Sequence, residues 1–233
     1  MVSSDARLEI ERMIEHSDLA GLLHMTALLH GHYCIGSALG VMAAHYAMKS
    51  MNVLQNTGME HLIAIVETNS CFSDGVQMVT GCSFGNNSLV YRDFGKTAFS
   101  LVDRSGVGFR VSVHPDVGDL LTNKNPEAQR LYTKTVNLRK ATPEEEVEML
   151  EANKRHCFEV LSIPVDQVFK LEEVKADIPS YSRILSSNFC SKCGEKVIET
   201  RALISGGVYY CIPCSGKRFN QLDWAGIHCT CGN

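Results

Sequence analysis

The sequence has no long hydrophobic run, no excess of positive charge and no apolar leader. Its longest stretch of small apolar residues, Tyr33 to Met48, is shorter than the roughly 20 residues of a membrane-spanning helix and contains His45. The first residues, MVSSDARLEIERM, are charged and lack the apolar core of a signal peptide. We therefore expect a cytoplasmic protein with no membrane partner.

The charge balance also argues against one class of partner. The 233 residues carry a formal net charge of −4, so the chain as a whole has no attraction for a phosphate backbone. No basic patch is prominent, and we do not expect a nucleic-acid partner. With 45% hydrophobic and 21% charged residues, the chain can bury one good core and one small satellite module.

Cysteine is abundant, and four of the ten cysteines form two pairs near the end of the chain. Cys190-x2-Cys193 and Cys211-x2-Cys214 are separated by seventeen residues. Four thiolates at this spacing are typical of a tetrahedral structural zinc site. In a reducing compartment, the remaining cysteines indicate metal ligation or thiol chemistry rather than disulfides.

Periodicity predicts an α+β fold with helices packed on a mainly antiparallel sheet. Residues 1 to about 50 show helical spacing, with a helix capped by Ser17 or Asp18 and running through Leu29, and another following Cys34. In that third helix a stripe of small residues, Gly36, Gly40 and Ala44, favours close packing against another backbone. Further segments complete the pattern: a buried strand at 62–66, a short helix capped by Ser73 or Asp74 and ending near Gly81, and an antiparallel meander of strands at 88–93, 97–103 and 107–113.

The second half of the chain predicts one strong helix followed by a separate small domain. Thr142, Pro143 and the three following glutamates form an N-cap, a proline at the first helical position and acids at the positive dipole end. We expect Val147, Leu150 and Cys157 to face the core. The expected organisation is a domain at 1–172, a polar linker at 173–188 and a zinc-finger domain with tail at 189–233. A finger on such a linker could pack on a second copy of the chain in a domain-exchanged dimer.

Two histidines and a cysteine alternate in the segment His30-Gly31-His32-Tyr33-Cys34. If the segment is extended, all three side chains point the same way and can bind a transition metal. If Cys34 begins the next helix, the helix dipole lowers the pKa of its thiol. The alternative interpretation is a buried, hydrogen-bonded histidine and an inert core cysteine.

A second group of polar residues follows the predicted strand at 62–66. Cys71, Asp74, Gln77 and Cys82 lie on one strand-to-helix connection, as in the wall of a pocket. Alternatively, Asp74 is only an N-cap, Gln77 a satisfied buried amide and both cysteines small hydrophobic side chains.

Two further motifs carry weaker signals. Asp93-Phe94-Gly95-Lys96 matches the magnesium motif of protein kinases, but the glycine-rich loop and catalytic-loop signature are absent from the sequence, so we interpret it as a hairpin corner. The tail residues His228, Cys229 and Cys231 could hold another soft ion, although a frayed terminus is the preferred interpretation.

Three strings resemble the FmdE family, named for the E component of formylmethanofuran dehydrogenase: HGHYCIGSALG, ETNSCFSDGVQMVTGCSFGNNSLVYRDFGKTAFSL and CSKCGEKV…GVYYCIPC. The resemblance covers roughly residues 20 to 114 and 160 to 215. Ile35 stands where many members have proline. The resemblance implies an α+β domain followed by a treble-clef-like zinc finger, often in a dimer, and an association with molybdenum or tungsten formylmethanofuran dehydrogenase operons. The family's pocket positions then fall on His32, Cys34, Cys71, Asp74, Gln77, Cys82 and Asp93.

The leading hypothesis is a His/Cys pocket that binds a transition metal (zinc, nickel or iron) or a metallocofactor, in or beside anaerobic molybdenum- or tungsten-linked redox metabolism. His32, Cys34 and Cys71 are the expected ligands, with His30 beside them. Asp74 would act as a base or orient a ligand, and Gln77 would donate to substrate. A homodimer and a molybdenum or tungsten redox enzyme are the expected partners.

Two alternatives remain open. In the first, Cys34 or Cys71 is an activated thiolate for sulfur or acyl transfer, with His32 as base and Cys82 as resolving thiol. In the second, the finger is a protein-docking module; residues 190–220 hold five Lys or Arg against two acids, without the helix-borne array of a DNA reader.

Overall fold

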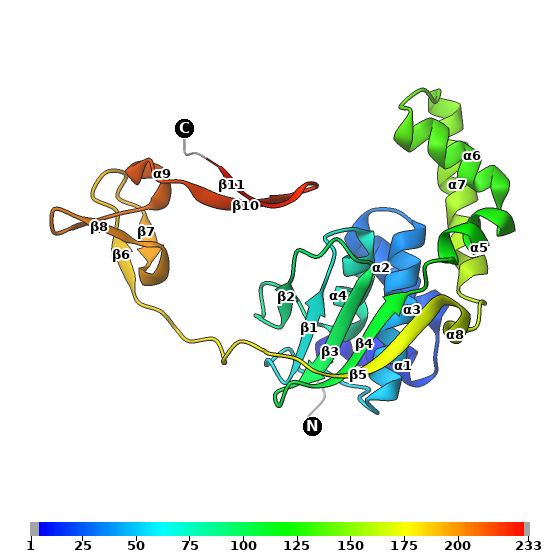
Figure 1. Cartoon of the computed structure of the whole chain (residues 1–233), viewed down its shortest axis with the longest axis horizontal. Coiled ribbons are helices and arrows are strands. Elements are labelled where there is room, and N and C mark those ends of the chain that lie inside the picture. The colour runs from blue at the N-terminus through cyan, green and yellow to red at the C-terminus, as the bar shows by residue number, and fades with distance from the viewer. Residues whose placement is uncertain (1–4, 231–233) are drawn as a thin grey trace. The chain divides into compact units, whose positions relative to one another are not determined.

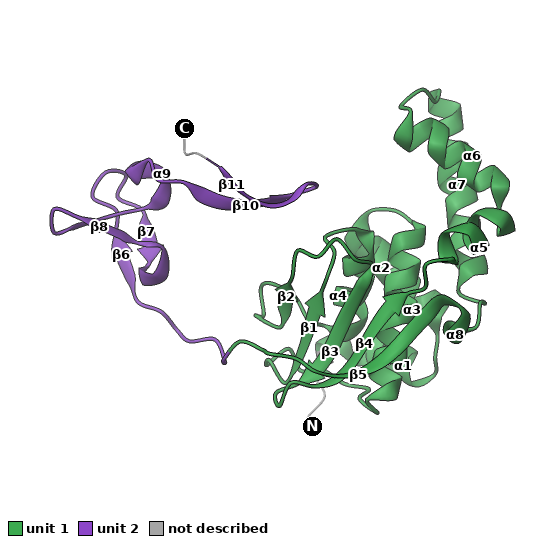
Figure 2. Ribbon diagram, viewed as in Figure 1, with its two compact units in different colours: residues 1–179 green, residues 180–233 purple. Residues whose placement is uncertain are grey.

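The computed structural model describes residues 5–230, and the chain divides into two compact units. Unit 1 runs from Met1 to Pro179 and unit 2 from Ser180 to Asn233, as Figure 2 shows. The predicted linker at 173–188 spans this division. Among residues 5–230, no helix has the length and apolar character needed to cross a bilayer.

A five-stranded sheet organises unit 1, in the order β2-β1-β3-β4-β5 (Figure 1). The strands are β1 (Leu62–Val66), β2 (Leu89–Tyr91), β3 (Ala98–Asp103), β4 (Val107–Val113) and β5 (Phe169–Lys175). β1 pairs antiparallel with β3, β3 with β4 and β4 with β5. The predicted α+β class with a mainly antiparallel sheet is therefore confirmed.

Two details of the predicted sheet are wrong. The first segment of the expected meander, β2, pairs parallel to β1 at the sheet edge instead of pairing with β3. The polar segment after Phe169 forms β5 across seven residues, so the first residues of the predicted linker belong to a strand. Phe169 and Leu171 of this edge strand pack in the main core, whereas its charged residues Lys170, Glu173 and Lys175 are exposed.

Four helices stand on one side of the sheet. They are α1 (Leu8–Glu15), α2 (Leu19–His30), α3 (Ile35–Ser50) and α4 (Cys71–Thr80), with a 3-10 turn, η1 (Asp5–Arg7), before α1. α3 and α4 lie against the face of the sheet, α2 packs on both of these helices, and α1 packs on α2. The predicted cap of α2 is confirmed, because Asp18 Oδ1 accepts from the Gly21 amide at 2.8 Å. α2 ends at Gly31, which adopts the left-handed conformation (φ 89°) that glycine tolerates.

The small-residue stripe of α3 lets α4 approach its backbone, as predicted. A Cβ added to Gly40 would lie 2.1 Å from the Phe72 carbonyl oxygen, and one added to Gly75 would lie 2.5 Å from the Ser37 oxygen. Neither position can hold a side chain at this separation. This contact fixes the N-terminal ends of α3 and α4 beside each other.

The main core lies between these helices and the sheet, with Phe72, Phe99 and Met42 among its fully buried side chains. A smaller apolar cluster covers the other sheet face, where residues of β1 and β3 meet the end of β5 and the chain just beyond it: Ile63, Ile65, Val102, Val174, Ala176 and Ile178. β1 is buried on both faces as a result.

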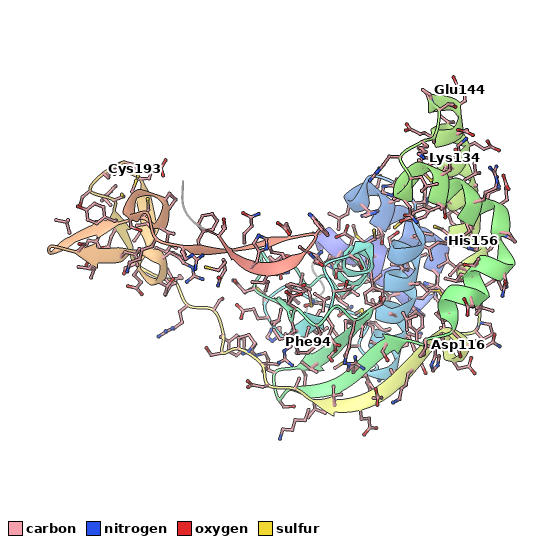
Figure 3. The ribbon with its side chains drawn as sticks, turned by 45° about the horizontal axis from the view of Figure 1, so that its top comes forward. Phe94, Asp116, Lys134, Glu144, His156 and Cys193 are labelled. Carbon is pink, nitrogen blue, oxygen red and sulfur yellow. The ribbon has the colours of Figure 1, made fainter. Side chains whose placement is uncertain are left out.

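The remaining helices of unit 1 follow β4. They are α5 (Val117–Lys124), α6 (Pro126–Tyr132), the π-helical turn η2 (Thr133–Asn137), α7 (Pro143–Val160) and α8 (Val165–Val168). The predicted N-cap of α7 at Thr142 is confirmed, and the structure adds a reciprocal hydrogen bond from Glu145 that makes it a capping box. Lys134 and Glu144, labelled in Figure 3, lie in this helical segment.

The core prediction for α7 is right for one residue of three. Cys157 is fully buried, but Val147 is 63% and Leu150 42% exposed. This part of α7 packs on α6 through Met149 and Ala152. Val147 and Leu150 lie on a different side of the helix from that pair.

Unit 2 is built from short elements. They are β6 (Ser187–Phe189), β7 (Lys196–Ile198), η3 (Glu199–Arg201), β8 (Leu203–Ser205), β9 (Val208–Tyr210), α9 (Ile212–Ser215), β10 (Phe219–Asp223) and β11 (Gly226–Thr230). The strands form three separate two-stranded sheets. Among its described hydrophobic side chains, Cys190 alone is buried.

Candidate metal centres

The four cysteines of unit 2 converge, as their spacing predicted. Their sulfur atoms all lie within 4.8 Å of one another. Cys190 and Cys193 belong to the connection between β6 and β7, while Cys211 caps α9 and Cys214 lies within it. The Sγ atoms of Cys193 and Cys211 are 3.9 Å apart. Two thiolates on one tetrahedral zinc, each with a bond of about 2.3 Å, lie about 3.8 Å apart. The cluster fits a small zinc-binding domain (Cys193 is labelled in Figure 3).

Backbone amides favour the thiolate form of one sulfur in this cluster, that of Cys190, whereas the pKa values of the Cys193 and Cys214 thiols are raised by hydrogen bonds to neighbouring sulfurs. Hydrogen bonds from the amides of Cys193 and Cys211 lower the pKa of Cys190 to about 6, against the opposing effect of burial. A Cys-x2-Cys turn that stabilises a thiolate in the absence of metal is suited to metal binding, because cysteine binds metal as the thiolate.

The second cluster lies in unit 1, where α2 ends and α3 begins. One ligand atom from each of His30, His32 and Cys34 lies within 4.8 Å of the others. The backbone differs from the predicted extended form: His30 is the last residue of α2, and the turn at Gly31 brings His32 back beside it. The two imidazole rings lie 4.5 Å apart between centroids. His32 is exposed, whereas Cys34 is buried.

Asp74 of α4 orients His30 toward Cys34. The Nδ1 atom of His30 lies 2.7 Å from Asp74 Oδ2, and its Nε2 lies 3.4 Å from the Cys34 sulfur. A carboxylate partner on Nδ1 holds the proton there and leaves the Nε2 lone pair facing the thiol. The helix cap of α4 is Ser70, so Asp74 is not an N-cap as the alternative interpretation had it. Gln77 Nε2 donates to Asp74 Oδ1 at 3.3 Å and extends the network.

Two helix N-termini bring two thiols together. Cys34 is the N-cap of α3, as predicted, and its sulfur accepts from the Ser37 amide at 3.4 Å. Cys71 is the first residue of α4, because this helix begins earlier than the predicted cap at Ser73 or Asp74. Gly36 makes room for it: a Cβ there would lie 3.0 Å from the Cys71 Cβ.

The pKa values of the paired thiols move apart. A hydrogen bond from the Cys71 thiol, together with the Ser37 hydroxyl and amide, lowers the pKa of Cys34 to about 5 despite its burial. The pKa of Cys71 is raised, first by donating that hydrogen bond and then by burial. The stable form of this pair therefore has a thiolate on Cys34 and a protonated Cys71 that donates a hydrogen bond to it.

Cys82 and Asp93 lie elsewhere. Cys82 is fully buried and follows the far end of α4, about 15 Å along the helix from Cys71 at 1.5 Å per residue. It contacts Asn56 and the Leu62 carbonyl, and burial raises its pKa to about 11. Asp93 is exposed in the connection between β2 and β3 and accepts from the Tyr91 hydroxyl at 2.6 Å.

Sequence reasoning missed Ser37 and the surroundings of Tyr33. Ser37 stands three residues after Cys34, the spacing of a capping pair, and this was the available signal. Tyr33 Oη lies 2.5 Å from His24 Nδ1, and its ring contacts Phe158 of α7. The contact between Tyr33 and Phe158 joins segments over a hundred residues apart in the sequence, so no local sequence pattern could predict it.

The preferred interpretation of the tail as a frayed terminus is wrong for the residues up to Thr230. Residues 226–230 form β11, paired along its length with β10. His228 Nε2 lies 3.5 Å from Asp223 Oδ2, and Cys229 is exposed. Cys231 lies outside the described residues.

The fold and the two clusters define a metal-binding class of protein, and comparison with known families gives it a name. The family model FmdE, described as molybdenum formylmethanofuran dehydrogenase operon, matches residues 29–170. The chain therefore belongs to the FmdE family, as the resemblance predicted. The matched residues include His30, His32, Cys34, Cys71 and Asp74.

Two individual proteins are similar to it. A probable S-adenosyl-L-methionine-binding protein of Archaeoglobus fulgidus is 34% identical over 207 residues, which cover 87% of this chain and 55% of the relative. The chain thus spans about half the length of that curated relative. The crystal structure of a tungsten formylmethanofuran dehydrogenase FmdE-like protein from Syntrophus aciditrophicus matches with a TM-score of 0.53 at 23% identity, covering 85% of this chain and 92% of the other. At this identity the second likeness shows the fold alone.

Proposed function

We propose that unit 1 binds a transition metal, or a cofactor containing one, through His30, His32, Cys34 and Cys71. The observation that carries this proposal is the chain of contacts from Asp74 through His30 to Cys34. The 3.4 Å between His30 Nε2 and the Cys34 sulfur is close to the separation of about 3.6 Å that a tetrahedral zinc imposes on a histidine and a thiolate.

Each side chain has a role in this site. Cys34 supplies a thiolate, and His30 supplies a lone pair whose direction is fixed by Asp74. His32 is exposed and closes the ligand set from the solvent side. Cys71 would be the fourth ligand of the metal. When substrate takes that coordination position instead, Cys71 would stay protonated and donate a hydrogen bond to Cys34. Imidazole and thiolate ligands suit zinc, nickel and iron, and the geometry of the site selects among them.

The family name supports a setting for this site. We place the protein in the cytoplasm, in or beside molybdenum- or tungsten-linked redox metabolism, as an accessory or metal-handling component. The four cysteines of unit 2 would hold a structural zinc. Unit 2 would serve as a docking module, with a second copy of the chain or a redox enzyme as partner. Its excess of lysine and arginine near the cysteines supports contact with an acidic protein surface.

The metal content of the chain tests the proposal. Anaerobically purified wild type should hold two metal ions per chain by elemental mass spectrometry. The Cys34→Ala and Cys71→Ala variants should lose one of them and keep the finger zinc. Cys82→Ala is the matched control, because it also removes a buried thiol of unit 1 but one outside the cluster, and it should keep both ions. Unchanged metal content in both Cys34→Ala and Cys71→Ala would remove the proposal.

A second candidate function rests on the same contacts without a metal. Asp74, His30 and Cys34 have the order of a carboxylate, base and nucleophile, as in a catalytic triad. In this reaction His30, rather than the predicted His32, would take the proton of the Cys34 thiol as the sulfur attacks an acyl or sulfur electrophile, and would pass that proton to the alcohol, amine or thiol that leaves. Stoichiometric alkylation of Cys34 in metal-free wild type, slowed in His30→Gln, would support this function. Equal alkylation rates in the two proteins would exclude it.

A further inference from the structure

A second cleft lies on unit 1, outside the cluster of histidines and cysteines. Its volume is about 520 Å³, in the range of sites for small molecules. The walls come from the start of β3, the end of β4, the beginning of α5 and the start of β5, where Lys170 stands. None of these lining residues has a role in the proposed function.

The lining residues are cationic or neutral. Lys96, Arg110, His114 and Lys170 line the cleft, with the hydroxyls of Thr97 and Ser112 between them; no aspartate or glutamate is among the described residues of its wall. Ammonium, guanidinium and hydroxyl groups are all hydrogen-bond donors. A wall of donors with a local positive charge favours an oxyanion as occupant.

Arg110 is held in place from behind by Glu67. The Glu67 carboxylate, whose side chain is only 7% exposed, accepts from Arg110 Nε at 2.6 Å and from Nη2 at 2.8 Å. This two-point pairing fixes the plane of the guanidinium. A donor that is already immobile loses little conformational entropy when it binds a ligand.

A second carboxylate near the cleft, that of Glu172, forms only a weak hydrogen bond with Arg110. Glu172 Oε2 lies 3.5 Å from Arg110 Nη1, longer than an ordinary charged hydrogen bond, while its other oxygen is 2.7 Å from the Lys170 ammonium. Arg110 Nη1 therefore retains capacity to donate. The three cations Lys96, Arg110 and Lys170 outnumber the two carboxylates, both of which stand outside the wall.

We propose that this cleft binds a small oxyanion, the phosphate or carboxylate group of a metabolite, with Arg110 as its fixed anchor and Lys96 and Lys170 as its flanking donors. The proposal does not depend on the metal site. The cleft and that site nevertheless share one end of the sheet: Glu67 follows β1 directly, and its Cα lies at most about 14 Å from that of Cys71, four residues on.

Titration of the full chain with inorganic phosphate and, separately, with malonate tests this assignment. Amide shifts recorded by NMR at constant ionic strength should saturate for residues 96–98, 110–118 and 170, with sodium chloride as the reference salt. Saturation by phosphate alone identifies a phosphate-bearing ligand, and saturation by malonate alone a carboxylate-bearing one; either result supports the cleft.

Charge-removing variants make the test specific. The double variant Lys96→Gln/Lys170→Gln keeps the Glu67–Arg110 pair and should weaken binding about tenfold or more, because two charge-assisted hydrogen bonds are lost. Lys175→Gln, at the other end of β5, is the matched control and should bind as wild type does. Shifts equal to those from chloride, shifts scattered over the surface, or equal affinity in the double variant and the control would overturn the proposal.

Discussion

The two units of this chain differ in what holds them together. Unit 1 encloses an extended apolar core between four helices and a five-stranded sheet. Unit 2 has three isolated two-stranded sheets and, among its described hydrophobic side chains, buries only Cys190. A two-stranded ribbon is at best marginally stable in water. We therefore expect unit 1 to bind metal on a finished fold and unit 2 to need a metal in order to fold.

This difference changes what each set of cysteines does. In unit 2, we expect metal binding to supply the folding free energy itself. In unit 1, packing at Gly40 and Gly75 positions the N-termini of α3 and α4. The thiols of Cys34 and Cys71 are held at these N-termini by the same packing. A metal bound there can be exchanged, or be open to substrate, without loss of the fold.

The largest effect should come from removing one finger ligand. In Cys193→Ser, loss of the proposed metal site should forfeit about 10 kcal/mol or more of metal-linked folding energy, so unit 2 should unfold while unit 1 melts as before. Limited proteolysis read by mass spectrometry would locate the cleavage sites. Cys229→Ser, which changes an exposed cysteine outside the four, should stay resistant. Resistance in both variants would show that unit 2 has other support.

A smaller effect, confined to unit 1, should follow from closing the contact between α3 and α4. In Gly75→Ala, a Cβ would stand within 2.7 Å of three backbone atoms, so the free energy of unfolding of unit 1 should fall by about 3 kcal/mol. Denaturant unfolding measures this. Gly118→Ala is the control, since nothing lies within 4 Å of its added Cβ. Equal stability of the two variants would contradict the packing described here.

The next effect concerns the affinity of the unit 1 metal site. Asp74→Asn removes the charge that orients His30 and should weaken metal binding at this cluster by about 10- to 100-fold, with the finger unaffected. Competition with a chromophoric chelator gives both affinities. Asp119→Asn, an exposed carboxylate of α5, should match wild type. A finger affinity that fell together with that of the cluster would argue against two independent sites.

The smallest effect is expected at the start of α7. Thr142→Ala deletes the side chain that accepts from the Glu145 amide and should cost about 1 kcal/mol of unit 1 stability. Thermal unfolding followed by circular dichroism would measure it. No change in unit 1 would mean that this end of α7 is not part of its cooperative fold.

Local patterns in the sequence predicted local structure well. The paired cysteines, the cap at Asp18 and the N-cap at Thr142 each depend on residues within a few positions of one another, and all three are present. The strand β5 escaped prediction because an edge strand with one solvent-facing side carries the charges of a linker.

Contacts between distant segments were less predictable. His30, His32 and Cys34 were found by their spacing, although the turn at Gly31 that unites them was not. The hydrogen bond between Asp74 and His30 joins residues 44 positions apart, and it required the packing of α4 against α2. Cys82 resembles Cys71 in its sequence surroundings, yet the helix between them separates the two.

The central claim is that unit 2 needs bound metal in order to fold, whereas unit 1 folds without metal and binds it afterwards. Two-dimensional amide NMR spectra of the full chain, recorded as a strong chelator removes both metals, test it most directly. We predict that signals from unit 2 collapse to the narrow range of an unfolded chain while those of unit 1 stay dispersed, with shifts limited to residues near His30, Cys34 and Cys71. Retention of both sets of dispersed signals, or their joint collapse, would contradict the account.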